Sequence, residues 1–486
     1  MILGKGGRIN RRMTRLLVQW WNTLEEWAQS PGFRLCALAL IVLAALIVRA
    51  LVAWIHPFLL PDSFDYDTLA RRLLLGKSYQ VTGMLAKRMP GYPLFIAGVY
   101  AIFGISHLAL LLIQAFAGAL LSWVVYLIGR RISPVVGLVA AALTAADPLL
   151  IGFSAALLSE IPFTLVFMIS LLMLVEILES RHAGGNLWRW VLFGLCFLIG
   201  VYIRAEVALC IFPLLAWVLF ADCRRNLPVA DAASNAAGLK SNEPDQPARQ
   251  SRIQNFFHSP RWGGLGVGAG TALAIVFVGL LPWWIRNDRL FGHDFFRFTT
   301  LQGISLYESV YSGATGGPRQ SHIPLPAYMR KMNESQRDLA WTRRAFGDIF
   351  DHPLRIARLA VVKIARTWSP WLHARGYARP WINISLTLWY APIFLLAIIG
   401  VFARGLPSRL LGVLLIPILY FTGMHALFLG SVRYRVPVTP LVMLLAAAGL
   451  NRLRGLWSAA DLRRRKAGLR GGSTDRDRSG PPVVLP

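Results

Sequence analysis

Long runs of apolar residues alternate along this chain with shorter polar stretches. We assign ten of these runs to membrane-spanning helices: 35–55, 107–127, 135–146, 160–178, 190–203, 207–220, 263–283, 384–402, 410–429 and 436–450. Several are about 20 residues long, the length that an α-helix needs to cross a hydrocarbon core of about 30 Å. The pattern predicts an all-α polytopic membrane protein with about ten transmembrane helices.

The composition supports the same class of protein. The chain of 486 residues is 55% hydrophobic and 15% charged, which is less charge than a soluble protein of this length would carry. Its net charge of +27 lies at the ends of the apolar runs and in the loops, where positive charge orients a membrane protein. We therefore expect membrane lipids and phosphates as partners, and no nucleic acid. The four cysteines lack the spacing of a zinc site.

Basic residues near the chain ends predict the orientation. Residues 1–34 carry more basic than acidic residues, which predicts a cytoplasmic N-terminal segment, and we expect the first apolar run to remain as an anchor. Residues 35–450 then form one transmembrane domain. Within it, residues 222–262 are rich in small and polar residues and predict a cytoplasmic linker. Residues 451–486 predict a basic cytoplasmic tail that is disordered.

Two stretches fall on the opposite, outer side of the membrane in this topology. The first outer loop covers residues 56–106 and ends in a short apolar segment, 93–106, that we place in the outer interface. The large outer loop covers residues 286–382. In its segment 351–367 the apolar residues recur at helical spacing, which predicts an amphipathic helix on the outer leaflet.

The topology also gathers polar residues on the outer side, each near the end of a span. They are Asp62, Asp65, Asp67, Lys87, Arg88, Asp147, Glu160, Arg204, Arg286, Arg433, Tyr434 and Arg435. Acidic and basic groups at the end of a membrane span are costly unless they lie at the membrane surface or in a water-filled cavity. Arginine binds phosphate oxygens with a planar fork, and a carboxylate can take a proton from an alcohol. No glycine-rich phosphate loop is present, so a membrane-borne sugar phosphate fits this site better than a nucleotide.

Several motifs, in order, carry a resemblance to a known family. Asp62, Tyr66, Ala70 and Gly76, followed by RMPGYP at 88–93, resemble the first outer loop of glycosyltransferase family 39 and its bacterial relatives. These include protein O-mannosyltransferases and lipid A aminoarabinose transferases, which share the GT-C membrane fold. Further matches are LSE at 158–160, RAE at 204–206, LPWWIRN at 281–287 and RYRVP at 433–437.

The resemblance implies a GT-C helical bundle that uses a polyprenyl-phosphate sugar donor at the periplasmic or outer face of a bacterial inner membrane. It implies that Asp62 is the catalytic base, and we add Glu160 to the catalytic candidates. The candidates for binding the lipid phosphate or the sugar are Tyr66, Lys87, Arg88, Tyr92, Arg204, Arg286, Arg433, Tyr434 and Arg435. The acceptor, whether lipid, glycan or protein, does not follow from the resemblance.

Carboxylate oxygens would also suit a divalent cation, and Asp62 and Asp147 are its candidate ligands. Each acidic candidate has a structural alternative as well. Asp62 could cap the helix that follows it, and Asp147 precedes a proline, as turn residues often do. Asp65 and Asp67 could be solvated helix charges. The outer arginines could be interfacial anchors.

Two other functions remain open from the sequence. A transporter or flippase of a lipid-linked or anionic solute would also need many spans and outer arginines. Transporters bind near the membrane midplane, in broken helices of repeated halves, whereas the charges here lie at one face and no internal repeat is seen. A lipid-binding scaffold without chemistry would tolerate the loss of Asp62.

Overall fold

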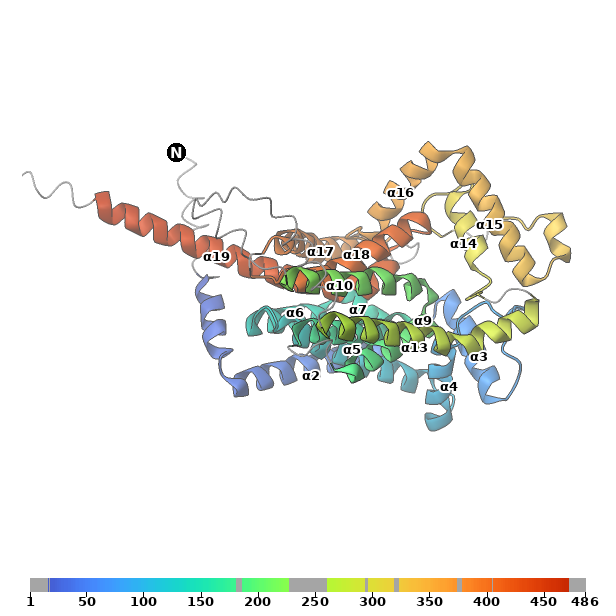
Figure 1. The fold of residues 1–486 in the computed structure, drawn as a ribbon, viewed down its shortest axis with the longest axis horizontal. Coiled ribbons are helices and arrows are strands. Elements are labelled where there is room, and N and C mark those ends of the chain that lie inside the picture. The colour runs from blue at the N-terminus through green and yellow to red at the C-terminus, as the bar shows by residue number, and fades with distance from the viewer. Residues whose placement is uncertain are drawn as a thin grey trace, which may run out of the picture.

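A computed structural model shows a bundle of long helices with a group of shorter helices at one end (Figure 1). The structure describes residues 16, 18–180, 186–226, 260–292, 296–318, 323–373, 378–403 and 405–471. No β-sheet occurs among these residues, whose only β-bridges are two isolated ones. The prediction of an all-α polytopic protein is confirmed.

Within the described part of the chain, eight segments are long and apolar enough to cross a membrane. They are α2 (Pro31–Ile55), α5 (His107–Gly129), α8 (Glu160–Glu179), η1 with α10 (Ala205–Cys210 and Ile211–Asn226), α13 (Pro260–Phe291), α17 (Pro380–Val401), α18 (Ser408–Leu427) and η4 with α19 (Val432–Val438 and Thr439–Gly471). A bent pair, α6 (Pro134–Ala146) and α7 (Pro148–Ser154), forms a ninth span if it counts as one.

The predicted span at 190–203 corresponds to α9 (Leu187–Ile203), which has 17 residues and falls just short of the length of a full span.

The break between α6 and α7 has a local cause. Asp147 ends α6 in an extended conformation and caps α7 by accepting a hydrogen bond from the Leu150 N–H at 2.8 Å. Pro148 then occupies the first helical position, where its missing N–H is not needed. The two helices therefore meet at an angle of 54°.

Some boundaries differ from the sequence-based expectation. α13 continues to Phe291, so Arg286 lies in a helix rather than at the start of the outer loop. α19 continues to Gly471, so the first part of the predicted disordered tail is helical. That stretch is rich in alanine, leucine and arginine, which favour helix. Residues 472–486, 1–15 and most of the predicted linker lie outside the described residues.

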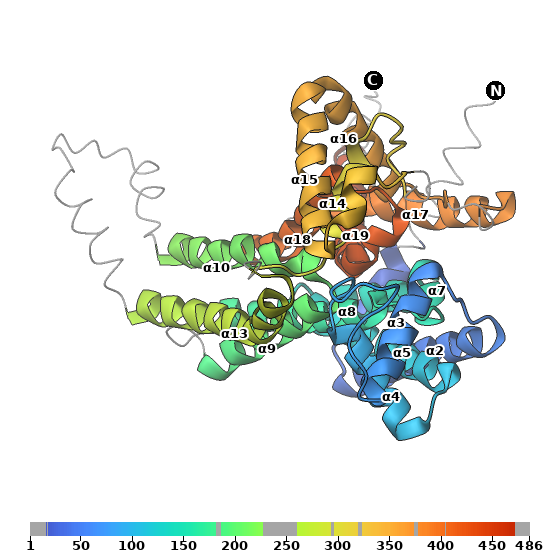
Figure 2. The same ribbon diagram turned by 90° about the vertical axis from the view of Figure 1, so that its right-hand side faces the viewer.

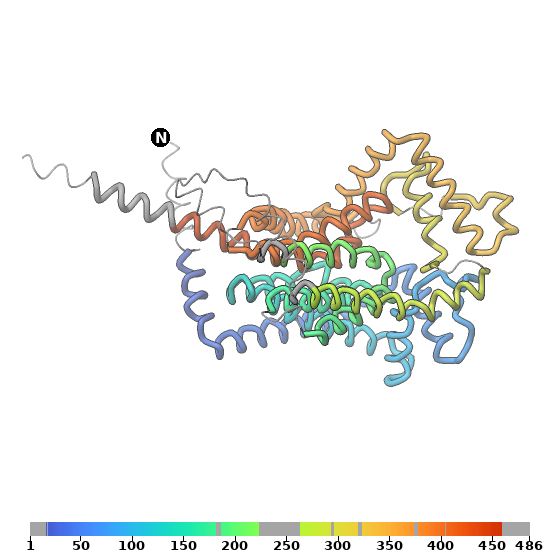
Figure 3. Tube along the Cα trace, in the orientation of Figure 1, coloured from blue at the N-terminus to red at the C-terminus, as the bar shows by residue number. Residues whose placement is uncertain are grey.

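The outer segments form their own helices at the end of the bundle where the first outer loop lies. They are α3 (Pro61–Leu74), α4 (Gly91–Phe103), α14 (Gln302–Val310), η3 (Ala327–Lys331), α15 (Glu334–Asp351) and α16 (Pro353–Thr367). Figure 2 views the molecule from this end and shows α14–α16 above α3. The trace in Figure 3 shows the first and the large outer segments meeting there, although they are far apart in the sequence.

Close packing of α17 against α19 holds the late spans together. A Cβ atom on Gly400 would overlap the Leu445 carbonyl, and one on Gly449 would overlap that of Leu396. Small residues allow helix backbones to approach closely in a membrane. This contact holds α17 beside α19, the helix that directly follows η4 and its Arg433.

Candidate functional site

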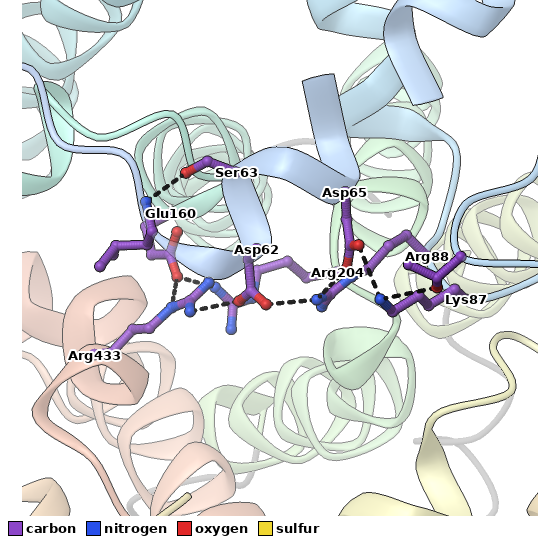
Figure 4. Close-up of polar contacts among 10 residues, drawn as sticks. Asp62, Ser63, Asp65, Lys87, Arg88, Glu160, Arg204 and Arg433 are labelled. Carbon is purple, nitrogen blue, oxygen red and sulfur yellow. Dashed lines mark hydrogen bonds and ion pairs between the residues drawn. The ribbon is translucent and has the colours of Figure 1, made fainter. Parts of the chain in front are cut away.

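Asp62 lies between two arginines that come from distant parts of the chain (Figure 4). Its Oδ1 accepts a hydrogen bond from Arg88 Nη2 at 2.5 Å, and its Oδ2 accepts one from Arg433 Nη1 at 2.7 Å. Asp62 is not the cap of α3, because Leu60 occupies that position and Asp62 lies inside the first turn. The capping alternative is therefore wrong, and the carboxylate contacts guanidinium groups instead.

The same arrangement continues on both sides of Asp62. Arg88 also donates to Asp65 Oδ2 at 2.9 Å, and Lys87 Nζ donates to Asp65 Oδ1 at 2.8 Å. Asp65 is therefore a buried, paired carboxylate rather than a solvated helix charge. Tyr66 lies under the Arg88 guanidinium, whose carbon is 5.3 Å from the centre of the ring. Arg88 is held on several sides, which is the rigidity that a binding site needs.

Glu160 anchors the other end of the network. It is the first residue of α8 and has no solvent exposure. Its Oε1 accepts hydrogen bonds from Arg433 and, at 3.0 Å, from Arg204 Nη1. Arg204, at the end of α9, also binds Glu206 at 2.8 Å.

Four carboxylates thus alternate with four cations in one continuous chain of ion pairs, in the order Lys87, Asp65, Arg88, Asp62, Arg433, Glu160, Arg204 and Glu206.

The neighbouring charges keep Asp62 ionised. Burial by itself would raise the pKa of this carboxyl, but the positive charges of Arg88 and Arg433, which also donate hydrogen bonds to it, lower the pKa to about 2. Within this network Asp62 is therefore a fully ionised but weakly basic group.

A cavity of about 270 Å³ opens along this network. Its charged lining comes from α3, the first outer loop, the end of α9, η1 and η4. The remaining lining comes mainly from α18, the start of α14 and the segment before α14. The lining residues are Asp62, Tyr66, Lys87, Arg88, Met89, Ile203, Arg204, Ala205, Glu206, Thr299, Leu301, Gln302, Ser305, Met424, His425, Phe428, Leu429, Arg433 and Tyr434.

Two side chains outside the cavity hold the first outer loop in place. Arg286 Nη2 donates to the Leu85 carbonyl at 2.8 Å, and its guanidinium lies 4.6 Å from the centre of the Trp283 ring. Glu334, from α15, accepts hydrogen bonds from the Leu85 and Ala86 N–H groups. Both contacts come directly before Lys87 and Arg88 in the chain, so they position the residues that reach the cavity.

Five predicted site residues do not line the cavity. Arg286 is one of them, and Glu160, a predicted catalytic residue, is another, because its side chain is fully buried. Tyr92 is fully buried and donates to Gln114 Oε1 at 2.6 Å. Arg435 is 1% exposed, binds the Thr367 carbonyl and lies 4.4 Å from the centre of the Tyr390 ring.

Asp147, the fifth, is also buried, and its Oδ2 accepts a hydrogen bond from the Tyr390 hydroxyl at 2.8 Å. The contacts of these five residues join separate segments of the chain, and none of the five lines the cavity.

The donor set near Asp62 does not fit a divalent cation. Both Asp62 oxygens contact guanidinium groups, and Asp147 faces Tyr390 instead of the cavity. Among the residues that the structure describes, no three His, Cys, Asp or Glu side chains form a group that could hold a metal ion.

Sequence reasoning missed several residues that line the cavity. Glu206 stands two positions after Arg204, a spacing that could have suggested a pair across a tight turn. His425, in α18, carries no such signal. Thr299, Gln302 and Ser305 carry none either, because only the folding of the large outer loop brings their neutral side chains here.

Comparison with known proteins gives one family. Residues 87–233 match the family described as dolichyl-phosphate-mannose-protein mannosyltransferase, which is less than half of the chain. No curated protein matches the chain in sequence.

Among solved structures, the oligosaccharyltransferase of Archaeoglobus fulgidus, in complex with Zn and sulfate, matches with 14% identity and a TM-score of 0.48. The match covers 90% of this chain and 51% of that one, so the chain spans about half the length of the archaeal enzyme. ArnT from Cupriavidus metallidurans, bound to undecaprenyl phosphate, matches with 13% identity and a TM-score of 0.40, over 85% of this chain and 77% of that one. The chain is thus a multi-pass membrane protein that resembles, over residues 87–233, the glycosyltransferase family of the dolichyl-phosphate-mannose-protein mannosyltransferases.

Proposed function

We propose that this protein transfers a sugar from a polyprenyl-phosphate donor to a hydroxyl or amine of an acceptor, by a single inverting displacement, at the outer face of a bacterial inner membrane. The observation that carries the proposal is Asp62 held between Arg88 and Arg433 in a cavity at the ends of the spans. The family match over residues 87–233 supports the same reaction class.

The balance of charge in the network says where a phosphate would bind. The network holds four carboxylates and four cations, so each guanidinium group already contacts a carboxylate. A phosphate that binds Arg88 and Arg433 must therefore replace a carboxylate at these guanidinium groups. Of the three carboxylates that bind Arg88 or Arg433, Asp62 is best placed to release them, because its side chain is 27% exposed, against 10% for Asp65 and none for Glu160. Arg88 and Arg433 would then bind phosphate oxygens with their planar forks.

This exchange would also activate Asp62. Once the arginines turn to the phosphate, the interaction that lowers the pKa of the carboxyl weakens, and Asp62 becomes a better base. The acceptor O–H would give its proton to Asp62 while the acceptor oxygen attacks the anomeric carbon. The bond from that carbon to the phosphate oxygen would break, and its electron pair would leave with the polyprenyl phosphate.

The leaving phosphate needs no general acid, because it departs as a stable anion whose charge the two arginines would stabilise. Attack on the face opposite the leaving group predicts inversion at the anomeric carbon.

The position of the network favours a transferase over a transporter, because its charged residues lie at the ends of the helices: Glu160 begins α8, Arg204 ends α9 and Arg433 precedes α19. A transport site would be expected nearer the middle of the spans.

The test compares two substitutions on one helix. Purified protein in lipid nanodiscs is incubated with labelled polyprenyl-phosphate sugars and a crude envelope extract as the acceptor source. Asp62→Asn removes the proposed base and should lower the transfer rate by about 10²- to 10⁴-fold. Asp67→Asn is the matched control, because Asp67 binds Arg71, Tyr100 and His107 and does not line the cavity.

Three results would count against the proposal. Transfer by Asp62→Asn at the wild-type rate would remove Asp62 from the chemistry. Retention of configuration in the product would replace the single displacement with a double one. Movement of the intact lipid across the bilayer without transfer would identify a flippase.

A further inference from the structure

Helix α16 turns an apolar face away from the protein. Leu354 is 86% exposed and Val361 is 66% exposed within the described part of the chain. Ala357 and Ile364 are exposed as well, and the spacing of these four residues places them on one side of the helix. Apolar side chains gain free energy when they leave water. The apolar face of α16, defined by these four residues, is therefore suited to an apolar partner outside the chain.

Most basic residues of α16 face the protein instead. Lys363 has no solvent exposure, and its Nζ donates to the Leu427 carbonyl at 2.8 Å. Arg355 Nη1 donates to the Tyr311 carbonyl at 2.8 Å. Since each residue advances an α-helix by about 100°, Lys363 lies about 200° from Val361 around the helix axis. α16 is thus inverted relative to a surface helix of a soluble protein, whose charged face meets water.

Further polar contacts fix this orientation. Arg366 Nε donates to the Gly430 carbonyl at 3.4 Å, and Arg435 Nη1 donates to the Thr367 carbonyl at 3.2 Å. Together with the hydrogen bond of Lys363, they join α16 to the end of α18 and to η4. A rotation that hid the apolar face would break all of these contacts, so the face stays on the outside.

The C-terminal end of α16 lies among the membrane spans. Trp368, the residue after the helix, donates from its indole N–H to Thr422 in α18 at 3.1 Å. The centre of its ring lies 5.8 Å from that of Phe394 in α17. Both α17 and α18 are long and apolar enough to cross a membrane. Figure 1 shows α16 projecting sideways from the bundle at this point, so the bilayer around these two spans extends beside it.

We propose that the apolar face of α16 is buried in the membrane leaflet at the outer end of the bundle. A helix of this kind inserts its apolar face about 5–10 Å into the boundary between headgroups and acyl chains. Arg358 is exposed four positions after Leu354, and its long side chain would reach the lipid phosphates. Lipid is the occupant because the bilayer that surrounds α17 and α18 already lies next to this helix.

The experiment measures lipid contact in the full-length protein, in nanodiscs that hold one copy each. Leu354→Cys and Val361→Cys, each in a background whose four native cysteines are replaced by alanine, are labelled with the fluorophore NBD. Lipids with a nitroxide on the acyl chain are then added as quenchers. Leu339→Cys is the matched control: Leu339 is an exposed leucine of α15, in the half of that helix that Figure 1 shows farther out than α16. We expect quenching at position 361 to be about threefold stronger than at position 339.

Iodide in the buffer gives the complementary reading and should quench the label at position 339 more than the label at position 361. If iodide reaches positions 354 and 361 as easily as position 339, the face lies in water and the inference is wrong. If neither quencher reaches positions 354 and 361, protein covers the face and the inference is again wrong. The measurement uses no donor or acceptor, so its outcome is independent of the proposed function.

Discussion

Glu160→Gln tests whether the ion-pair network holds the outer end of the bundle together. The substitution keeps the size of the side chain and removes its charge. In the wild type, one fully buried oxygen of Glu160 joins Arg433 of η4 to Arg204 at the end of α9. After the substitution, the two guanidinium groups face each other without the carboxylate between them.

The structure sets the size of the effect. Removing one partner of a buried ion pair costs about 3–5 kcal/mol of stability, because the other charge stays buried without compensation. Here Arg204 keeps Glu206 and Arg433 keeps Asp62, and their side chains are 10% and 23% exposed. We therefore expect the lower end of that range, about 3 kcal/mol.

The assay is thermal unfolding of the purified protein in detergent, followed by intrinsic tryptophan fluorescence. Glu179→Gln is the control, since it makes the same chemical change at the opposite end of α8. Glu179 is 37% exposed and pairs with Arg131. Exposed pairs contribute about 0–1 kcal/mol, so its midpoint should stay close to that of the wild type.

The reasoning fails if Glu160→Gln unfolds at the wild-type temperature, or if Glu179→Gln is destabilised to the same extent. Either result would mean that the buried carboxylate is no more important than a surface one. The transfer assay on the same samples adds a second readout. Loss of transfer at a temperature where Glu160→Gln is still folded would show that Glu160 also orients Arg433 for the reaction.

Two further predictions concern acid and packing. The acid limb of the pH–rate profile of kcat/KM reports the free enzyme, in which the pKa of Asp62 is lowered to about 2. The acid limb of kcat reports the complex, in which phosphate has drawn the arginines away from Asp62, so we expect it at a higher pH. Acid limbs at the same pH would contradict the exchange. The same lowered pKa adds stability above 3.8 that is lost as the pH falls toward 2. In α4, a Cβ on Gly91 would meet the Tyr202 carbonyl at 2.6 Å, whereas one on Gly98 would meet nothing within 4 Å. Gly91→Ala should therefore cost about 1–3 kcal/mol in a thermal unfolding assay and Gly98→Ala should not, and equal midpoints would show that the contact can relax.

The sequence predicted the membrane helices well because span length and hydropathy are local properties. The run 107–127 is contained in α5, His107–Gly129, and the run 160–178 in α8, Glu160–Glu179. It also predicted that acidic and basic residues from several spans gather at one end of the bundle, since the direction of each span follows from the one before it. The structure brings Asp62, Glu160 and Arg433 together there. Amphipathic spacing is also a local property, so the sequence predicted a helix at 351–367, and the structure shows it as α16 (Pro353–Thr367).

The partners of each charge depended on tertiary structure. Asp62 and Arg433 are 371 positions apart, and their contact depends on the packing of η4 against α8, α16 and α18. Arg433 and Arg435 are equivalent by sequence, yet one reaches the cavity while the other binds the Thr367 carbonyl.

A one-dimensional pattern thus determined the class of protein, the spans and the kinds of charge at one end. The three-dimensional packing decided which charges pair, which line the cavity and which only join helices. The physical reason is that hydropathy acts residue by residue along the chain, whereas an ion pair acts across a few ångströms between segments whose distance is set by the whole fold.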